Sequence, residues 1–85
     1  MKVSIFGLGY VGVVCAACFA KLGHKITGVD VIDYKIDAIN KGKAPLEEKG
    51  LNNLLKEQVS LKKLSATKNV KNAILNTDIS FICVG

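Results

Sequence analysis

The stretch SIFGLGYVGVV, residues 4–14, decides the fold of this chain. Gly7, Gly9 and Gly12 keep the spacing G-x-G-x-x-G and follow a short apolar run. This spacing alone is a weak signal, and it acquires meaning only from the elements around it. The residues on both sides therefore have to show whether the turn holds a dinucleotide or only joins a strand to a helix.

The flanking residues predict a strand before the glycines and a helix after them. Residues 2–6 have the composition of a short strand, and apolar side chains recur at helical spacing over residues 10–22. Gly23 is well placed to cap the C-terminal end of this helix. A glycine-rich turn between a strand and a helix is the context that a dinucleotide-binding fingerprint requires.

Each glycine has a physical role in such a turn. Gly7 permits the tight exit from the strand, Gly9 lets a pyrophosphate approach the backbone, and Gly12 lets the helix pack against the strand. The amides of Tyr10 and Val11 begin the helix, where the positive end of the dipole favours an anion. Packing against the loop is the alternative role for Tyr10.

An acidic residue ends the second predicted strand, residues 25–30. Asp30 follows the glycines at roughly the 20-residue distance of the dinucleotide fingerprint. A carboxylate there accepts hydrogen bonds from the ribose hydroxyls of adenosine and repels a 2′-phosphate. Because the chain also has no arginine to bind that phosphate, we expect NAD as the cofactor rather than NADP.

Lys35 lies shortly after Asp30, inside the next predicted helix. It is close enough to reach the adenosine ribose or its phosphate. A lysine in this position is also compatible with simple solvation at the helix surface. The residue type alone leaves both roles open.

The remainder of the chain continues the alternation of helices and strands. The predicted elements are a helix from the N-cap Asp33 to Gly42, a loop over residues 43–50, a short helix from Leu51, a weak strand over 62–66, a helix over 69–76 and an apolar strand over 78–84. The apolar composition of residues 78–84 is typical of a strand covered on both faces. This order predicts an α/β fold with a doubly wound parallel sheet of about four strands, in the order 3-2-1-4.

Composition limits the classes of partner. The chain has 85 residues, so it forms one small domain, and its formal charge of +5 comes from lysine alone. Nucleic-acid recognition depends largely on arginine, and the lysines between Lys56 and Lys71 alternate with apolar residues, which favours a solvated face. We expect no nucleic-acid partner. With no apolar run of about 18 residues and no signal peptide, we also expect no membrane partner and a cytoplasmic location.

Three cysteines raise the alternatives of metal or redox chemistry. Cys15 and Cys18 form a C-x-x-C pair, and Cys83 is the third. A closed zinc site needs four ligands, and His24 is the only other candidate in the sequence that is not a carboxylate. We therefore expect no metal and no disulfide, with the thiols buried as small hydrophobic groups.

Several stretches together resemble one known family. They are SIFGLGYVG, GHKITGVDV, KIDAINKGKAPLEEKGL and DISFICVG, and they resemble the N-terminal NAD-binding domain of the UDP-glucose/GDP-mannose 6-dehydrogenases over essentially all of the chain. The residues at Ser4–Gly7 and 81–85 are most similar to the GDP-mannose branch. The resemblance implies a Rossmann-type fold, of which residues 1–85 are the first half only.

The resemblance also implies an activity and roles for particular residues. Members of the family oxidise the C6 alcohol of a nucleotide sugar to the carboxylate with two NAD, through a thioester on a cysteine. Cofactor roles are implied for the loop from Gly7 to Gly12, including Tyr10 and Val11, for Asp30 and for Lys35.

The chain also departs from the family pattern. Lys49 stands where the family usually has proline, and the segment before the third strand is shortened. The Thr-Pro-Ser motif and the catalytic cysteine of the family lie outside these residues. We therefore expect no catalytic residue here, a truncated piece that is inactive alone, and a full-length protein that is a homo-oligomer acting on a nucleotide sugar. The alternative is a non-enzymatic regulatory module that senses dinucleotides and shares only the glycine fingerprint.

Overall fold

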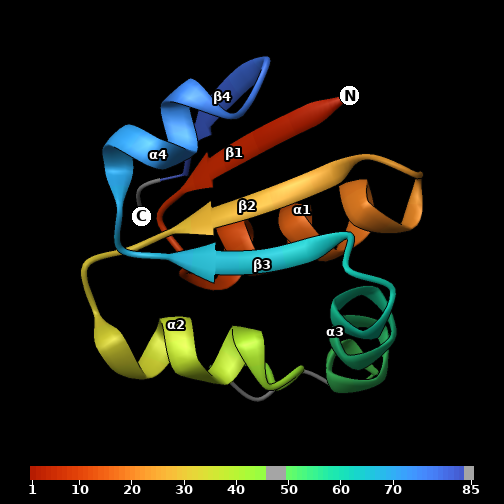
Figure 1. The fold of residues 1–85 in the computed structure, drawn as a ribbon. Helices are drawn as coiled ribbons and strands as arrows, with labels where there is room; N and C mark the ends of the chain where they lie inside the picture. The colour runs from red at the N-terminus through yellow and green to blue at the C-terminus, as the bar shows by residue number, and fades with distance from the viewer. Residues whose placement is uncertain (46–49, 84–85) are drawn as a thin grey trace.

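The computed structural model describes residues 1–45 and 50–83 of the chain. Its elements are, in chain order, β1 (Lys2–Phe6), α1 (Tyr10–Lys21), β2 (Lys25–Val29), α2 (Asp33–Asn40), α3 (Leu51–Ser60), β3 (Leu64–Thr67), α4 (Val70–Leu75) and β4 (Ile79–Ile82). The four strands form one parallel sheet in the order β3-β2-β1-β4 (Figure 1). This confirms the predicted α/β class and the predicted strand order.

The order of the strands places the glycine turn at a switch point of the sheet. β1 lies in the middle, where Phe6 is in register with Val29 of β2 on one side and with Ile82 of β4 on the other. After β3 the chain crosses back to the far side of β1, so consecutive connections diverge from the carboxyl end of β1. In open parallel sheets, ligands bind in the crevice at such a point.

One face of the sheet is apolar and carries the core. Val3, Ile5 and Ile26 are almost completely buried on it and pack with Val13 and Leu55 of the helices. α1 lies behind the sheet and α4 in front of it in Figure 1. The two helices therefore cover opposite faces, as right-handed crossovers in opposite directions require.

The opposite face carries a row of hydroxyl groups. Ser65, Thr27, Ser4 and Ser80 are in register across the four strands. The fully buried Ser4 hydroxyl lies 2.6 Å from the hydroxyl of Ser80 and 3.0 Å from that of Thr77. These contacts supply hydrogen-bond partners where α4 covers the sheet.

The predicted N-cap of α2 is wrong by one position. Ile32 is the N-cap, Asp33 is the first helical residue, and its carboxylate forms an ion pair of 2.8 Å with Lys68. The amides of Val31 and Ile32 instead bind the carboxylate of Asp30. Asp30 therefore supplies the acceptor at this turn, where Asp33 was expected to do so.

Other element ends agree with the prediction to within a few residues. Gly23 follows α1 with a φ of +106° and donates its amide to the carbonyl of Ala20, as a glycine cap does. The third strand begins at Leu64 rather than residue 62, because Lys62 adopts a left-handed turn conformation (φ 60°). The helix from Leu51 is longer than expected and reaches Ser60.

The prediction that the last strand is covered on both faces is wrong for this chain. All four residues of β4 are exposed, and Ile82 is 75% accessible. Within residues 1–45 and 50–83, β4 pairs only with β1. The apolar side chains of β4 therefore lie beside only one neighbouring strand in this part of the chain, and little covers the two faces of β4.

Some predictions fall outside the described residues. These are residues 46–49 of the predicted loop, including Lys49, and residues 84–85 at the end of the predicted last strand. In the part of the chain that the structure describes, no helix has the length and apolar character needed to cross a membrane.

Candidate dinucleotide site at the end of β1

Gly7 makes the turn out of β1 and occupies a position that only glycine tolerates. Its φ is +98°, and its amide donates a 2.9 Å hydrogen bond to the carbonyl of Val29. A Cβ at this position would overlap the carbonyl oxygen of Cys83. The residue therefore combines a positive φ with close contact to the residue that follows β4.

Gly12 allows α1 to approach the turn closely. A Cβ on Gly12 would overlap the carbonyl oxygen of Gly7 and lie 2.9 Å from its carbonyl carbon. A backbone atom cannot move aside as the end of a flexible side chain can. The packing role predicted for this glycine is therefore visible in the structure, and the first turn of α1 is held against the end of β1.

The N-terminal end of α1 is open to an anion. Gly9 is the N-cap in an extended conformation and makes no side-chain capping bond, and the first turn has no acidic residue. Amides in the first turn of a helix have no acceptor within the helix. Tyr10 and Val11 are 55% and 60% accessible, so their side chains are not packed into the core.

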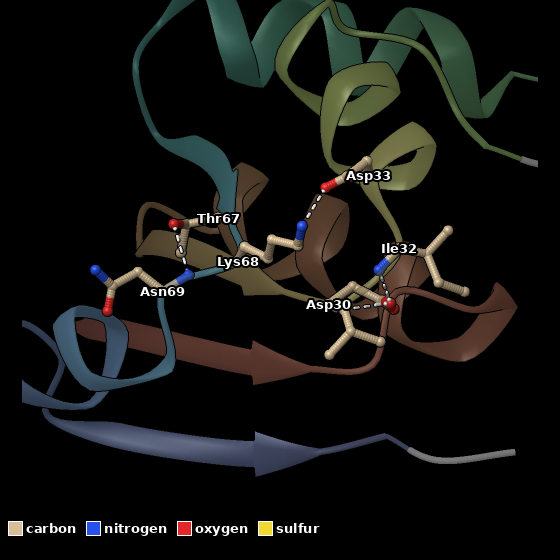
Figure 2. A network of polar contacts seen from close by, with 7 residues as sticks. Asp30, Ile32, Asp33, Thr67, Lys68 and Asn69 are labelled. Atoms are coloured by element: carbon tan, nitrogen blue, oxygen red, sulfur yellow. Dashed lines mark hydrogen bonds and ion pairs between the residues drawn. The ribbon is translucent and has the colours of Figure 1, made fainter.

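Asp30 braces the glycine loop. Its Oδ2 accepts a 2.8 Å hydrogen bond from the amide of Leu8, between the first two fingerprint glycines. Its Oδ1 accepts bonds from the amides of Val31 (2.7 Å) and Ile32 (3.0 Å), the latter visible in Figure 2. One carboxylate thus links the turn after β1 to the turn after β2.

These contacts also set the protonation of Asp30. Burial by itself raises the pKa of the Asp30 carboxyl, because it disfavours the charged form. The hydrogen bonds from the backbone amides, led by that of Leu8, and the charge of Lys35 act in the opposite direction and prevail. The pKa of Asp30 therefore lies below its ordinary value, and the group is a carboxylate at neutral pH.

Lys35 is brought near this carboxylate, whereas Lys68 is held elsewhere. Lys35 is half-buried in the first turns of α2, and its positive charge contributes to the lowered pKa of Asp30. Lys68 reaches from the end of β3 to Asp33, as Figure 2 shows. Asp33 and Lys68 are 75% and 58% exposed, so their ion pair adds little to stability.

A hollow beside Asp30 extends the site toward α4. It has a volume of about 210 Å³ and is lined by Phe6, Gly7, Val29, Asp30, Val31 and Val70. Apart from the carboxylate and the backbone of Gly7, its lining is apolar. Such a surface suits a flat ring with a polar neighbour.

Four residues at the site, Leu8, Gly28, Val31 and Val70, were not among the predicted site residues. Leu8 is fully buried, and its side chain fills the space beside Gly28, where a Cβ would lie 2.8 Å from Leu8 Cδ2. A glycine inside a predicted strand indicates that another group packs closely against its backbone, as Leu8 does against Gly28. Val31 and Val70 carry no such signal, because only the folded chain brings them to one hollow.

The residues fit a dinucleotide at three points. The uncapped first turn of α1 offers amides to a pyrophosphate. Three hydrogen bonds occupy Asp30, and a carboxylate has about four acceptor positions, so about one remains for a ribose hydroxyl. The apolar hollow lies next to that carboxylate.

The cysteines differ from the prediction of burial. Cys18 is exposed, and Cys15 and Cys83 are half-buried. Within the described ranges, no group of three histidine, cysteine, aspartate or glutamate side chains is placed to hold a metal ion.

Comparison with known proteins identifies a family over the whole chain. Residues 1–85 match the model of the UDP-glucose/GDP-mannose dehydrogenase family, NAD binding domain. The chain is 54% identical to the GDP-mannose 6-dehydrogenase of Pseudomonas aeruginosa and 41% identical to the UDP-glucose 6-dehydrogenase of Rhizobium meliloti. Each alignment covers the entire chain but only 20% of the relative, so the chain spans about a fifth of their length.

Solved structures agree with the sequence comparison. The fold matches the GDP-mannose dehydrogenase of Pseudomonas aeruginosa, solved as a ternary complex, with a TM-score of 0.98 over 100% of this chain and 20% of that one. It matches the UDP-glucose dehydrogenase of Pyrobaculum islandicum with a TM-score of 0.93 at 39% identity, over 99% of this chain and 19% of that one. The chain therefore belongs to the UDP-glucose/GDP-mannose dehydrogenase family, whose NAD binding domain it matches.

Proposed function

We propose that this chain binds the adenosine diphosphate half of NAD as part of a nucleotide-sugar 6-dehydrogenase. The observation that carries the proposal is the hydrogen bond from the Leu8 amide to Asp30. This hydrogen bond joins Asp30, the acid proposed to bind the ribose, to the glycine loop, which is proposed to face the phosphates. Both recognition elements are thereby held in a fixed relation before the cofactor arrives, which lowers the entropic cost of binding.

The roles of the residues follow from their positions. The amides of Gly9, Tyr10 and Val11, at the positive end of α1, receive the pyrophosphate. The remaining acceptor position of Asp30 receives a ribose hydroxyl. Lys35 adds positive charge near the ribose and phosphate. When bound, NAD supplies the hydride acceptor, and these residues orient it.

The hollow beside Asp30 is proposed to receive the adenine ring. Val31, in the loop after β2, and Val70, the first residue of α4, provide apolar contacts. The same carboxylate disfavours NADP, because a 2′-phosphate would place like charges together. A lowered pKa keeps that repulsion in place at neutral pH.

For the whole protein, we propose oxidation of the C6 alcohol of UDP-glucose or GDP-mannose to the carboxylate, with two NAD reduced. The relatives named GDP-mannose 6-dehydrogenase share 51–54% identity with this chain, against 41% for the UDP-glucose enzyme, which favours GDP-mannose. The relatives reported above are named as dehydrogenases and give no support to a regulatory, non-enzymatic module. A homo-oligomeric state and a cytoplasmic location remain predictions.

The decisive experiment is an activity screen of the full-length protein. UDP-glucose, GDP-mannose and related nucleotide sugars would each be incubated with NAD or NADP while formation of the reduced cofactor is followed. We expect turnover with NAD and GDP-mannose, with two reduced cofactors per sugar oxidised. Binding of NAD without turnover on any nucleotide sugar would instead support the regulatory alternative.

A further inference from the structure

Cys15 and Cys83 approach each other where α1 meets the end of β4. The amide of Cys83 donates a 2.7 Å hydrogen bond to the carbonyl of Phe6, which fixes its backbone beside the end of β1. Its Cβ lies 3.6 Å from the position that a Cβ on Gly12 would occupy. Cys15 lies on the same side of α1 as Gly12, because helical residues three apart are neighbours. The Cys83 side chain thus lies against the part of α1 that carries Cys15.

The two thiols share one environment. Both side chains are half-buried, and both pack against the same apolar core. Burial raises the pKa of the Cys15 thiol, and the nearby thiols of Cys83 and Cys18 raise it further. The Cys83 side chain, as a hydrogen-bonding neighbour, also raises the pKa of Cys15, as its position against α1 leads us to expect.

Metal ligation does not explain this group of thiols. In residues 1–45 and 50–83, no three potential ligands are arranged to hold a metal ion. Two half-buried thiols, one on α1 and one that packs against the same stretch of α1, are instead suited to oxidation to a disulfide. Cys18, which is exposed on the same helix, is the natural comparison for the reactivity of a thiol without such a contact.

We propose that Cys15 and Cys83 form a reversible oxidation site, at which a peroxide converts the two thiols into a disulfide bond between α1 and the residue after β4. The Cys83 thiolate attacks one oxygen of hydrogen peroxide, the O–O bond breaks, and water leaves after protonation. Cys83 is then a sulfenic acid. The Cys15 sulfur attacks this sulfur, the S–O bond breaks, and a second water leaves. The two sulfurs lose two electrons in total, the peroxide gains them, and the two thiol protons end in water.

The order of the two steps follows from the environment of Cys15. Burial raises the pKa of the Cys15 thiol and disfavours its thiolate, so we assign Cys15 to the second step. Cys15 therefore resolves the oxidised Cys83. The bond would hold Cys83 where its carbonyl oxygen packs on Gly7 and its Cβ faces Gly12, so it would tie the glycine turn to β4.

The test is peptide mapping of the full-length protein after treatment with hydrogen peroxide. Remaining thiols are blocked with an alkylating reagent, the protein is digested, and linked peptides are identified by mass spectrometry. We expect a link between the peptides of Cys15 and Cys83 that forms independently of protein concentration and disappears after dithiothreitol.

Single variants make the assignment specific. Cys18→Ser should leave the link intact, and Cys15→Ser or Cys83→Ser should abolish it. The wild-type map decides the question even where a variant fails to fold. A link between Cys15 and Cys18, a link from either partner to a cysteine elsewhere, or full alkylation of all three thiols after peroxide would overturn the proposal. The map requires no cofactor or sugar, so its outcome is separate from that of the activity screen.

Discussion

The carboxylate of Asp30 accepts hydrogen bonds from three backbone amides and is also proposed to bind the ribose. Replacement by alanine should weaken NAD binding to the full-length protein by about 1.5–3 kcal/mol, because charge-assisted hydrogen bonds to the ribose are lost. Calorimetric titration with NAD measures this directly. The matched control is Asp33→Ala, which removes a nearby exposed acid that pairs with Lys68 instead. Equal dissociation constants for wild type and Asp30→Ala would refute the ribose role.

The same residue predicts a dependence on pH. The pKa of Asp30 is lower in the folded chain than in the unfolded one, so its contribution to stability is fully present above the unfolded pKa, roughly 4. The contribution is lost as the pH falls through the lower, folded value. Denaturant titrations from pH 7 down to pH 3 should show a loss of stability below about pH 4 that is smaller in Asp30→Asn. Identical acid profiles for the two proteins would contradict the assigned contacts.

The close packing at Gly12 predicts that one added methyl group destabilises the protein. An alanine Cβ would meet the carbonyl group of Gly7, so α1 or the turn has to shift. We expect Gly12→Ala to lower the free energy of unfolding by about 1–3 kcal/mol, as overpacking does, and to weaken NAD binding as well. The control is Cys18→Ala, an exposed position on the same helix where the change should stay within about 0.5 kcal/mol. A Gly12→Ala protein as stable as wild type would argue against close packing here.

At the level of elements, β4 is one of the two edge strands of the sheet, and all of its residues are exposed. Ile79, Phe81 and Ile82 are 43%, 41% and 75% accessible, and an apolar edge strand of this kind invites pairing with another chain. The 85-residue chain on its own should therefore self-associate or be unstable. Ile82→Lys should reduce the association, because a charge on an edge strand opposes pairing.

Sedimentation velocity over a range of concentrations measures the association. Leu61→Lys is the control, since Leu61 is 55% accessible but lies in the turn after α3, away from β4. Monomeric behaviour of the wild-type chain, together with cooperative unfolding at ordinary domain stability, would show that the edge is tolerated.

At the level of the whole molecule, the chain is one layer of four parallel strands with helices on both faces, and its proposed site lies at one end of β1. The site is proposed to bind and orient the cofactor, and we expect none of the three cysteines to be the nucleophile of the family. We predict that the isolated 85-residue chain gives no reduction of NAD with any nucleotide sugar. Measurable turnover by the purified chain, absent from a Gly12→Ala preparation, would overturn this.

The fold was predictable because its signals are local. The helical spacing of apolar residues, the glycines at the ends of α1 and α2, and the alternation of elements all act within a few residues. The errors came where contacts are distant in sequence. Asp33 was expected to cap α2, but it is the first residue of the helix and pairs with Lys68, while the carboxylate of Asp30 accepts the amide of Ile32 at the turn. The burial of β4 depends on which elements pack against it, and the amino-acid composition of the strand does not specify those elements.

The sequence by itself determined the glycine turn, the position of Asp30 and the order of the strands, because turn geometry and side-chain periodicity are properties of short segments. Only the tertiary structure decided that Asp30 holds the Leu8 amide and that Cys83 packs against the part of α1 that carries Cys15. These pairs are far apart in the chain, and the parallel crossovers bring them together. The physical reason is that a parallel sheet joins strand ends that are distant in sequence at one edge, so the site is assembled by packing.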